Sequence, residues 1–297
     1  MVFINTEGKF NDNTYLIDGN LFRLEGTLSI YIIENNGMRM MVDTSSDLAA
    51  RKIVKKLKEF ELFPIHKILL THSHWDHMQS VGKLKKSMKE TNIEVLASEN
   101  AINKLKNPGV MNDVFEYGTT NPVEDDVNPL KDGDIIDING LKLEVMNFFG
   151  HTMDSIAIFD KKNKNIFVGD AIIDRLSYDT FQPTFMPPEF NEPEILKTFK
   201  KLRNMKDRLN SICLAHYGVW KDEDFERILN EMEELHHKPK DSIIKWYNEN
   251  PSVKYIASNF HKTFIPNSKM HTKENMIGLE LQIEWLLKGL KMSGFIK

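Results

Sequence analysis

The chain has 297 residues, of which 41% are hydrophobic and 28% charged, and its formal net charge is −4. This composition is typical of a globular protein with a large core, and the slightly acidic charge gives no reason to expect a polyanionic partner. No apolar run approaches the roughly 18 residues of a membrane span, and the N-terminus lacks the pattern of a signal peptide, so we expect a cytoplasmic protein. The single cysteine, Cys213, excludes an intrachain disulfide and is expected to be buried.

The first half of the chain predicts strands joined by tight turns, then strands that alternate with helices. An Asn-Gly pair between apolar runs is typical of a β-hairpin, because a type I′ turn needs two positive φ angles. Two such pairs are present: Asn36-Gly37 between 28–34 and 38–43, and Asn139-Gly140 between 134–138 and 141–148. Further strands are predicted at 93–97, 155–160, 165–169 and 211–215.

Apolar residues at helical spacing predict helices over 47–60 and 76–89, and Pro193 suits the first turn of another. The segments 107–131 and 172–192 are rich in proline and are expected to be long irregular loops, which are often functional. After Gly218 the pattern is mostly helical. We therefore expect a domain over 1–220 and a C-terminal helical extension, 221–297, packed on it. Its last apolar stripe, 279–290, is expected to dock on its own domain, with self-association as the alternative.

The densest group of reactive side chains follows the apolar run 68–70. It holds His72, His74, Asp76 and His77 within six residues. Neutral imidazole and carboxylate are ligands that zinc and iron accept, and the loop after a buried strand is a usual place for a site. We therefore predict a metal site here.

Three further residues of ligand type follow apolar strands, each with a glycine within two positions: His151, Asp170 and His216. Glycine lets the backbone turn sharply and approach closely. Any one of these residues alone would be better interpreted as an ordinary turn or surface residue. Four strand ends that all deliver metal ligands favour one shared site.

On these motifs the chain resembles the metallo-β-lactamase-fold hydrolase superfamily. The matching pieces are Val42-Asp43-Thr44, His72-x-His74-x-Asp76-His77, Gly150-His151-Thr152, Gly169-Asp170 and His216. The resemblance covers roughly residues 28–218. It implies an α/β (α+β) fold, a four-layer αβ/βα sandwich, here with a C-terminal helical extension.

The resemblance also implies two divalent metal ions, zinc first, with iron or manganese as alternatives. The implied ligands are His72, His74 and His151 for one ion, Asp76, His77 and His216 for the other, and Asp170 as the bridge. Asp43 would orient the ligand loops by hydrogen bonds, and Asp76 would also orient the nucleophile. The implied enzyme is a hydrolase in which a hydroxide bridging the two ions attacks an ester, thioester or lactone.

The ligand set is similar to those of glyoxalase II and of lactonases. However, the Arg-rich C-terminal motifs of glyoxalase II are missing, and Ile173 stands where lactonases keep a tyrosine. Asp154 stands where many members have glycine, and either faces the site or is a solvated or capping carboxylate. An aromatic segment is expected to wall a pocket for a small-molecule acyl substrate, with the C-terminal helices as a lid. The candidate substrate contacts are Tyr178, Phe181, Phe185 and Tyr217, for which packing is the alternative.

Three other functions share this ligand set: a phosphodiesterase or nuclease, a mononuclear iron persulfide dioxygenase, and a non-enzymatic metal-binding module. The lysine-rich runs 52–58 and 83–89 are interpreted as solvated helix faces, which disfavours nucleic acid as a partner. The remaining histidines match no motif and are interpreted as surface or core residues: His66, His236, His237, His261 and His271.

Overall fold

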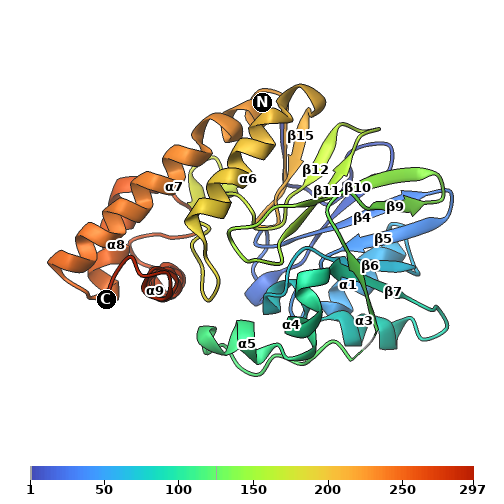
Figure 1. Ribbon diagram of the computed structural model, residues 1–297, viewed down its shortest axis with the longest axis horizontal. Helices are drawn as coiled ribbons and strands as arrows, with labels where there is room; N and C mark the ends of the chain where they lie inside the picture. Colours follow the sequence, from blue (N-terminus) through green and yellow to red (C-terminus); the bar gives the residue numbers. More distant parts are fainter. Residues whose placement is uncertain (1, 125) are drawn as a thin grey trace.

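The computed structural model describes residues 2–124 and 126–297. Two seven-stranded sheets pack face to face, with helices on their outer faces (Figure 1). The strand order is β2-β3-β4-β5-β6-β7-β8 in the first sheet and β1-β16-β15-β12-β11-β10-β9 in the second. This arrangement confirms the four-layer sandwich expected from the sequence.

The strands of the first sheet are β2 (Gly8–Lys9), β3 (Thr14–Asp18), β4 (Ser29–Asn35), β5 (Met38–Val42), β6 (Lys67–Leu70), β7 (Glu94–Ser98) and β8 (Val127–Leu130). Those of the second are β1 (Val2–Ile4), β9 (Ile135–Ile138), β10 (Leu141–Asn147), β11 (Ile156–Asp160), β12 (Asn165–Phe167), β15 (Ser211–Cys213) and β16 (Val219–Lys221). A separate hairpin is formed by β13 (Asp174–Ser177) and β14 (Thr180–Gln182).

The helices beside the first sheet are α1 (Ala50–Glu59), α2 (Trp75–Met78), α3 (Val81–Ser87), α4 (Ile102–Lys106), α5 (Gly109–Asn112) and the 3-10 turn η3 (Asp113–Phe115). The others are α6 (Glu192–Asn204), α7 (Glu223–Glu249), α8 (Val253–Phe264) and α9 (Ile277–Met292).

Side chains alternate along the strands, so each sheet contributes to two hydrophobic layers. In β4, Tyr31 and Ile33 pack between the sheets, whereas Ile30 and Ile32 pack against the helices. The layer between the sheets also contains Cys213, which is fully buried as expected. The outer layers are covered by α1 and α3 on the first sheet and by α6 and α7 on the second.

Both predicted hairpins are confirmed. The pair Asn36-Gly37 has φ angles of 48° and 81° between β4 and β5, and Asn139-Gly140 has 46° and 99° between β9 and β10. These are the positive values that a type I′ turn requires.

The helix predicted over 76–89 is wrong in its continuity, because the structure divides it into α2 and α3. The backbone N–H of Ser80 donates to the carbonyl of Ser45 at 3.1 Å, and the Ser80 hydroxyl donates to the carbonyl of Ser46 at 2.6 Å. The backbone N–H therefore makes a tertiary hydrogen bond in place of the one that would continue α2. This break ends the helix just after His77.

The two proline-rich segments are also more regular than predicted. Segment 172–192 contains the hairpin β13–β14, and segment 107–131 contains α5, η3 and β8. Strand β8 includes Pro129 and lies at the edge of its sheet, which is where a residue without a backbone N–H is tolerated.

The C-terminal helices α7, α8 and α9 share one hydrophobic cluster with α6 and the second sheet (Figure 1). The stripe on α9 is buried there, as predicted, so it is not available for self-association. The boundary at residue 220 stays a prediction. Among the described residues no helix has the length and apolar character needed to cross a bilayer.

Candidate metal centre

All seven predicted ligands meet at one edge of the sandwich. They come from loops that follow four strands: β6 (His72, His74, Asp76, His77), β10 (His151), β12 (Asp170) and β15 (His216). Residues up to 144 positions apart in the chain therefore converge, as the four strand ends indicated.

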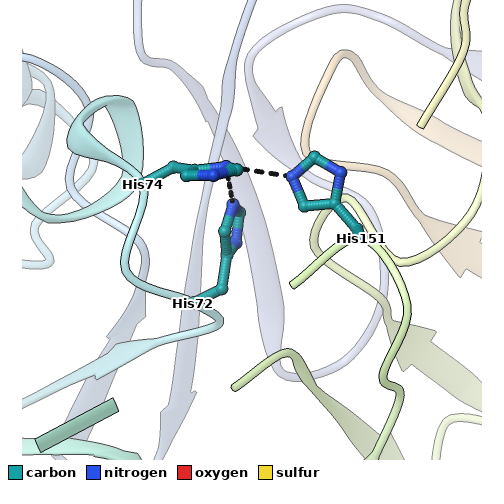
Figure 2. Close-up of side chains that lie close together, drawn as sticks. All are labelled: His72, His74 and His151. Carbon is teal, nitrogen blue, oxygen red and sulfur yellow. Dashed lines mark hydrogen bonds between the residues drawn. The ribbon is translucent and has the colours of Figure 1, made fainter. Parts of the chain in front are cut away.

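The first group of ligands is His72, His74 and His151 (Figure 2). Nδ1 of His74 lies 3.1 Å from Nε2 of His72 and 3.0 Å from Nε2 of His151. All three rings are buried. Tetrahedral ligands at about 2.1 Å from a zinc ion lie roughly 3.4 Å apart, so this spacing suits one metal ion.

The second group is Asp76, His77 and His216. Oδ1 of Asp76 lies 3.7 Å from Nε2 of His77, and Oδ2 of Asp76 lies 3.5 Å from Nε2 of His216. Oδ2 of Asp170 is 3.4 Å from both of these nitrogens. The same oxygen is 3.9 Å from Nε2 of His72 in the first group, so one carboxylate reaches both groups.

Hydrogen bonds to backbone carbonyls fix the orientation of three of the imidazoles. The donor–acceptor pairs are His74 Nε2 to Pro187 at 3.1 Å, His151 Nδ1 to Thr184 at 2.8 Å, and His216 Nδ1 to Thr27 at 2.7 Å. Each bond places the proton on the ring nitrogen that faces away from the other ligands. The opposite nitrogen then presents its lone pair to the centre, as a metal ligand must.

Asp43 makes hydrogen bonds of the kind that the resemblance implies. Its carboxylate accepts from the backbone N–H of Thr71 at 2.8 Å, from the Thr71 hydroxyl at 2.8 Å and from His77 Nδ1 at 2.9 Å. The Thr71 oxygen in turn lies 3.1 Å from His72 Nδ1. One buried carboxylate thus orients a ligand in each group.

The chemistry of the donor set fits divalent cations. Among the described residues, Nε2 of His77 and Oδ1 of Asp170 are buried polar atoms that lack a hydrogen-bond partner. Burial and the neighbouring imidazoles hold the pKa of His72 and His74 well below the ordinary range, so both rings are neutral. Burial opposes a charge on His216, but nearby carboxylates, Asp170 foremost, outweigh it and raise its pKa to about 10. A cation in the second group would supply the positive charge that these carboxylates favour.

Two glycines are required where ligand loops approach other segments. A Cβ at Gly150, whose φ is +129°, would lie 2.3 Å from the backbone nitrogen of Ile195. A Cβ at Gly169 would lie 2.8 Å from the Thr71 hydroxyl oxygen. Glycine at these two positions therefore lets the loops that carry His151 and Asp170 pack closely against Ile195 and Thr71.

A cavity of about 430 Å³ opens onto the ligands His74, Asp76, His151, Asp170 and His216. The remaining lining is mostly apolar: Leu21, Phe22, Leu24, Trp75, Phe115, Tyr117, Leu176, Met186, Met270, Ile277, Leu281 and Trp285. The polar exceptions are Thr27, Gln182, His271, Asn275 and Gln282. Helix α9 forms part of this wall, in line with the expected covering by C-terminal helices.

The four aromatic candidates for substrate contact lie outside this cavity, so their expected placement needs correction. Phe185 is fully buried in the core, and Tyr217 is nearly so. The Tyr178 hydroxyl donates to Asp224 of α7 at 2.9 Å, and Phe181 packs on Phe260 of α8. Helices α7 and α8 cover this segment, so its aromatic rings face the helices. The neighbouring Gln182 lines the cavity, because successive side chains of β14 point to opposite sides.

Asp154 is neither solvated nor directed at the ligands. It is fully buried, and its carboxylate accepts a hydrogen bond from Lys104 of α4 at 2.8 Å. The unexpected carboxylate is thus paired with Lys104, which also forms a salt bridge with Glu189.

Sequence reasoning missed the aromatic wall of the cavity. The Phe115 ring lies 5.2 Å from the His74 ring and 5.2 Å from the Trp285 ring, measured between centroids. Tyr117 stacks on Trp75 at 4.7 Å. Two of these residues lie in segment 107–131, whose unusual length was the signal available. His271, interpreted as a surface or core residue, also lines the cavity.

Residues 25–216 match the family model of the metallo-beta-lactamase superfamily, and the chain therefore belongs to that superfamily. Its members are largely metal-dependent hydrolases.

Curated proteins resemble the chain at low identity. The hydroxyacylglutathione hydrolase of Aliivibrio salmonicida is 25% identical over 218 residues, 73% of this chain and 67% of that protein. The hydroxyacylglutathione hydrolase of Rhodopseudomonas palustris (strain BisB18) is 26% identical over 150 residues, 50% of this chain and 48% of that protein. The chain thus spans about half to two thirds of the length of these curated relatives.

The fold is similar to that of a solved archaeal metallo-beta-lactamase superfamily protein from Sulfolobus tokodaii. The TM-score is 0.65 at 17% identity, and the alignment covers 95% of this chain and 99% of that one. The C-terminal helices are therefore included in the similarity of fold.

Proposed function

We propose that the protein is a dinuclear metal-dependent hydrolase that cleaves an ester, a thioester or a lactone. The observation that carries this proposal is the pair of ligand groups joined by Oδ2 of Asp170, at the base of a mostly apolar cavity. Two cations bound there would provide a nucleophile at neutral pH and polarise a substrate carbonyl.

The residues of the chain would contribute positioning and exclusion of water. Asp43 and the backbone carbonyls hold the imidazoles in the tautomers that bind cations. Asp76 extends one carboxylate between His77 and His216, where its free lone pairs would orient the attacking water. Phe115 and Trp285 would keep bulk water away from the carbonyl.

The cavity lining favours a carbonyl substrate over a phosphodiester. Within the described residues the lining contains neither lysine nor arginine. Proteins that hold a nucleic-acid backbone neutralise its phosphates with such side chains. The same lack disfavours the glutathione carboxylates that the names of the curated relatives suggest.

The proposal is tested by metal analysis together with hydrolysis. We expect about two divalent ions per chain, and metal-dependent cleavage of p-nitrophenyl esters, thioesters or lactones. The variant His74→Ala should lose both the hydrolysis and metal ions. His66→Ala, a change at a half-buried histidine that belongs to none of the ligand groups among the described residues, should lose neither.

Other outcomes would overturn the proposal and identify the alternative. One iron per chain with persulfide-dependent oxygen uptake would indicate the dioxygenase. Faster turnover of bis(p-nitrophenyl) phosphate than of any acyl substrate would indicate the phosphodiesterase. Metal-loaded protein that cleaves none of these substrates would indicate a non-enzymatic metal-binding module.

A further inference from the structure

The cavity above the metal centre carries no fixed charge apart from the predicted ligands. In the described part of the chain, its lining has no lysine, arginine or glutamate, and its aspartates are Asp76 and Asp170. Burial lowers the pKa of His271 to about 4, so that this ring is neutral at physiological pH. A charged group on a substrate, away from the metal ions, would lose its hydration without gaining a partner.

The apolar character of the lining continues to the mouth of the cavity. Leu24, Tyr117 and Ile277 line the cavity and are also 54%, 46% and 78% exposed, respectively. Large exposed hydrophobic side chains that gather around one opening are typical of a site for an apolar ligand. An acyl chain reaching from the centre to the solvent would contact apolar side chains along its whole path.

Helix α9 brings one unusual polar group into this wall. Gln282 is 8% exposed, and its amide nitrogen is buried without a hydrogen-bond partner among the described residues. The helix is held in place, since Trp285 Nε1 donates to the carbonyl of Phe115 at 3.2 Å and Lys288 donates to that of Val114 at 3.1 Å. Gln282 lines the cavity, and such a donor on a fixed helix in a cavity wall is suited to an acceptor on a ligand.

We propose that the substrate is an uncharged ester or thioester of an apolar acyl chain, and that Gln282 donates a hydrogen bond to one of its oxygens. This inference rests on the proposed hydrolase function and names its substrate class. Water adds across the acyl C–O or C–S bond, which breaks to give a carboxylic acid and an alcohol or thiol. The acid ionises, and the uncharged lining favours its release.

The first test measures binding without catalysis. The probe is 2-decanone, which has an apolar chain and a carbonyl but no leaving group, and binding to the full-length protein is followed by calorimetry. We expect 9-oxodecanoate, which places a carboxylate at the far end of a similar chain, to bind at least tenfold more weakly. Equal or tighter binding of the charged probe would overturn the proposal.

Gln282→Leu tests the hydrogen bond in the same assay. Leucine is similar in size and apolar, so a purely structural effect would change the binding of every ligand alike. We expect the affinity for 2-decanone to fall about tenfold while that for butylbenzene, which lacks a carbonyl, is kept or rises. An equal loss for both probes, or no loss for 2-decanone, would contradict the assigned role of Gln282.

The second test uses p-nitrophenyl esters of increasing acyl length. Each buried methylene strengthens binding roughly fourfold, so we expect kcat/KM to rise at least twentyfold from acetate to octanoate. Ile277→Asp, at the mouth, should reduce this preference at least fivefold. Ile135→Asp is the matched control, because Ile135 is similarly exposed, at 55%, but lies on β9 away from the cavity lining.

The outcomes separate this inference from the proposed function. If acetate is cleaved and octanoate is no better, the substrate class is wrong while the hydrolase stands. If the ketone binds as expected but no acyl compound is cleaved by the metal-loaded protein, the hydrolase fails while the assignment of the cavity to an uncharged apolar ligand stands.

Discussion

Replacing Asp43 with asparagine should weaken the second group of ligands without disturbing the fold. In the side chain of Asp43→Asn, the amide oxygen can still accept from the backbone N–H of Thr71. The amide NH2 then replaces the oxygen that faces the Thr71 hydroxyl and His77 Nδ1, at 2.8 and 2.9 Å. The hydroxyl can rotate to accept, but the ring N–H of His77 would meet another donor.

His77 can resolve this conflict only by moving its proton to Nε2. That proton would occupy the lone pair that faces Asp170, 3.4 Å away, where a cation would bind. Loss of such an outer partner typically lowers metal affinity by about 10- to 100-fold, which corresponds to roughly 1.4–2.8 kcal/mol. We therefore expect a weakening of this size for the ion held by the second group.

The affinity is measured by titrating metal-free protein with Zn²⁺ in competition with a chromogenic chelator. Asp160→Asn is the matched control, because Asp160 is also fully buried and accepts two hydrogen bonds, both from Asn163, but contacts none of the predicted ligands. Its metal affinity should stay within twofold of the original. Tight binding of both ions by Asp43→Asn would refute the argument that this carboxylate selects the tautomer of His77.

Three further predictions concern stability and specificity. A Cβ at Gly289 of α9 would lie 2.1 Å from the Phe185 carbonyl oxygen, so Gly289→Ala should lower the unfolding free energy by about 1–3 kcal/mol. Gly82→Ala is the control, because a Cβ there would have no atom within 4 Å, and it should not lower the unfolding free energy. Urea denaturation measures both variants. Burial lowers the pKa of His236 to about 4, so the unfolded state binds a proton first as the pH falls. The contribution of His236 to the free energy of unfolding is therefore complete above pH 6.5 and should be lost towards pH 4, by roughly 2 kcal/mol between pH 7 and 4.5. If the free energy of unfolding of His236→Gln fell equally over this pH range, the prediction would be contradicted. Tyr178→Phe removes the hydrogen bond to Asp224 and should lower the unfolding free energy by about 1 kcal/mol. The KM for an ester should stay within twofold, because Tyr178 lies outside the cavity. A large rise in KM would show instead that Tyr178 contacts the substrate.

Sequence patterns predicted those parts of the structure that depend on local chemistry. The turns at Asn36-Gly37 and Asn139-Gly140 follow from the φ angles that these residues tolerate. The helix over 76–89 was predicted as continuous, because its apolar spacing is helical throughout. The break at Ser80 depends on the carbonyls of Ser45 and Ser46, which no local pattern reveals.

The candidate ligands were identifiable because metal binding needs particular side chains. In this chain they occur in short motifs that follow strand ends. The cavity wall was not identifiable, because it depends on which side of a chain segment faces the site. Phe181 and Gln182 are adjacent, yet the packing of α8 turns the first into the core and leaves the second on the cavity.

The sequence by itself determined the ligand types and the turns, since these follow from the chemistry of residues close together in the chain. The class of fold followed from the resemblance of the ligand motifs to those of a known superfamily. Only the tertiary structure decided the character of the cavity. Phe115 and Trp285 are 170 positions apart and meet because α9 packs across the segment that follows α5. Burial of the apolar stripe of α9 drives this contact, and the energy of such packing depends on the whole core.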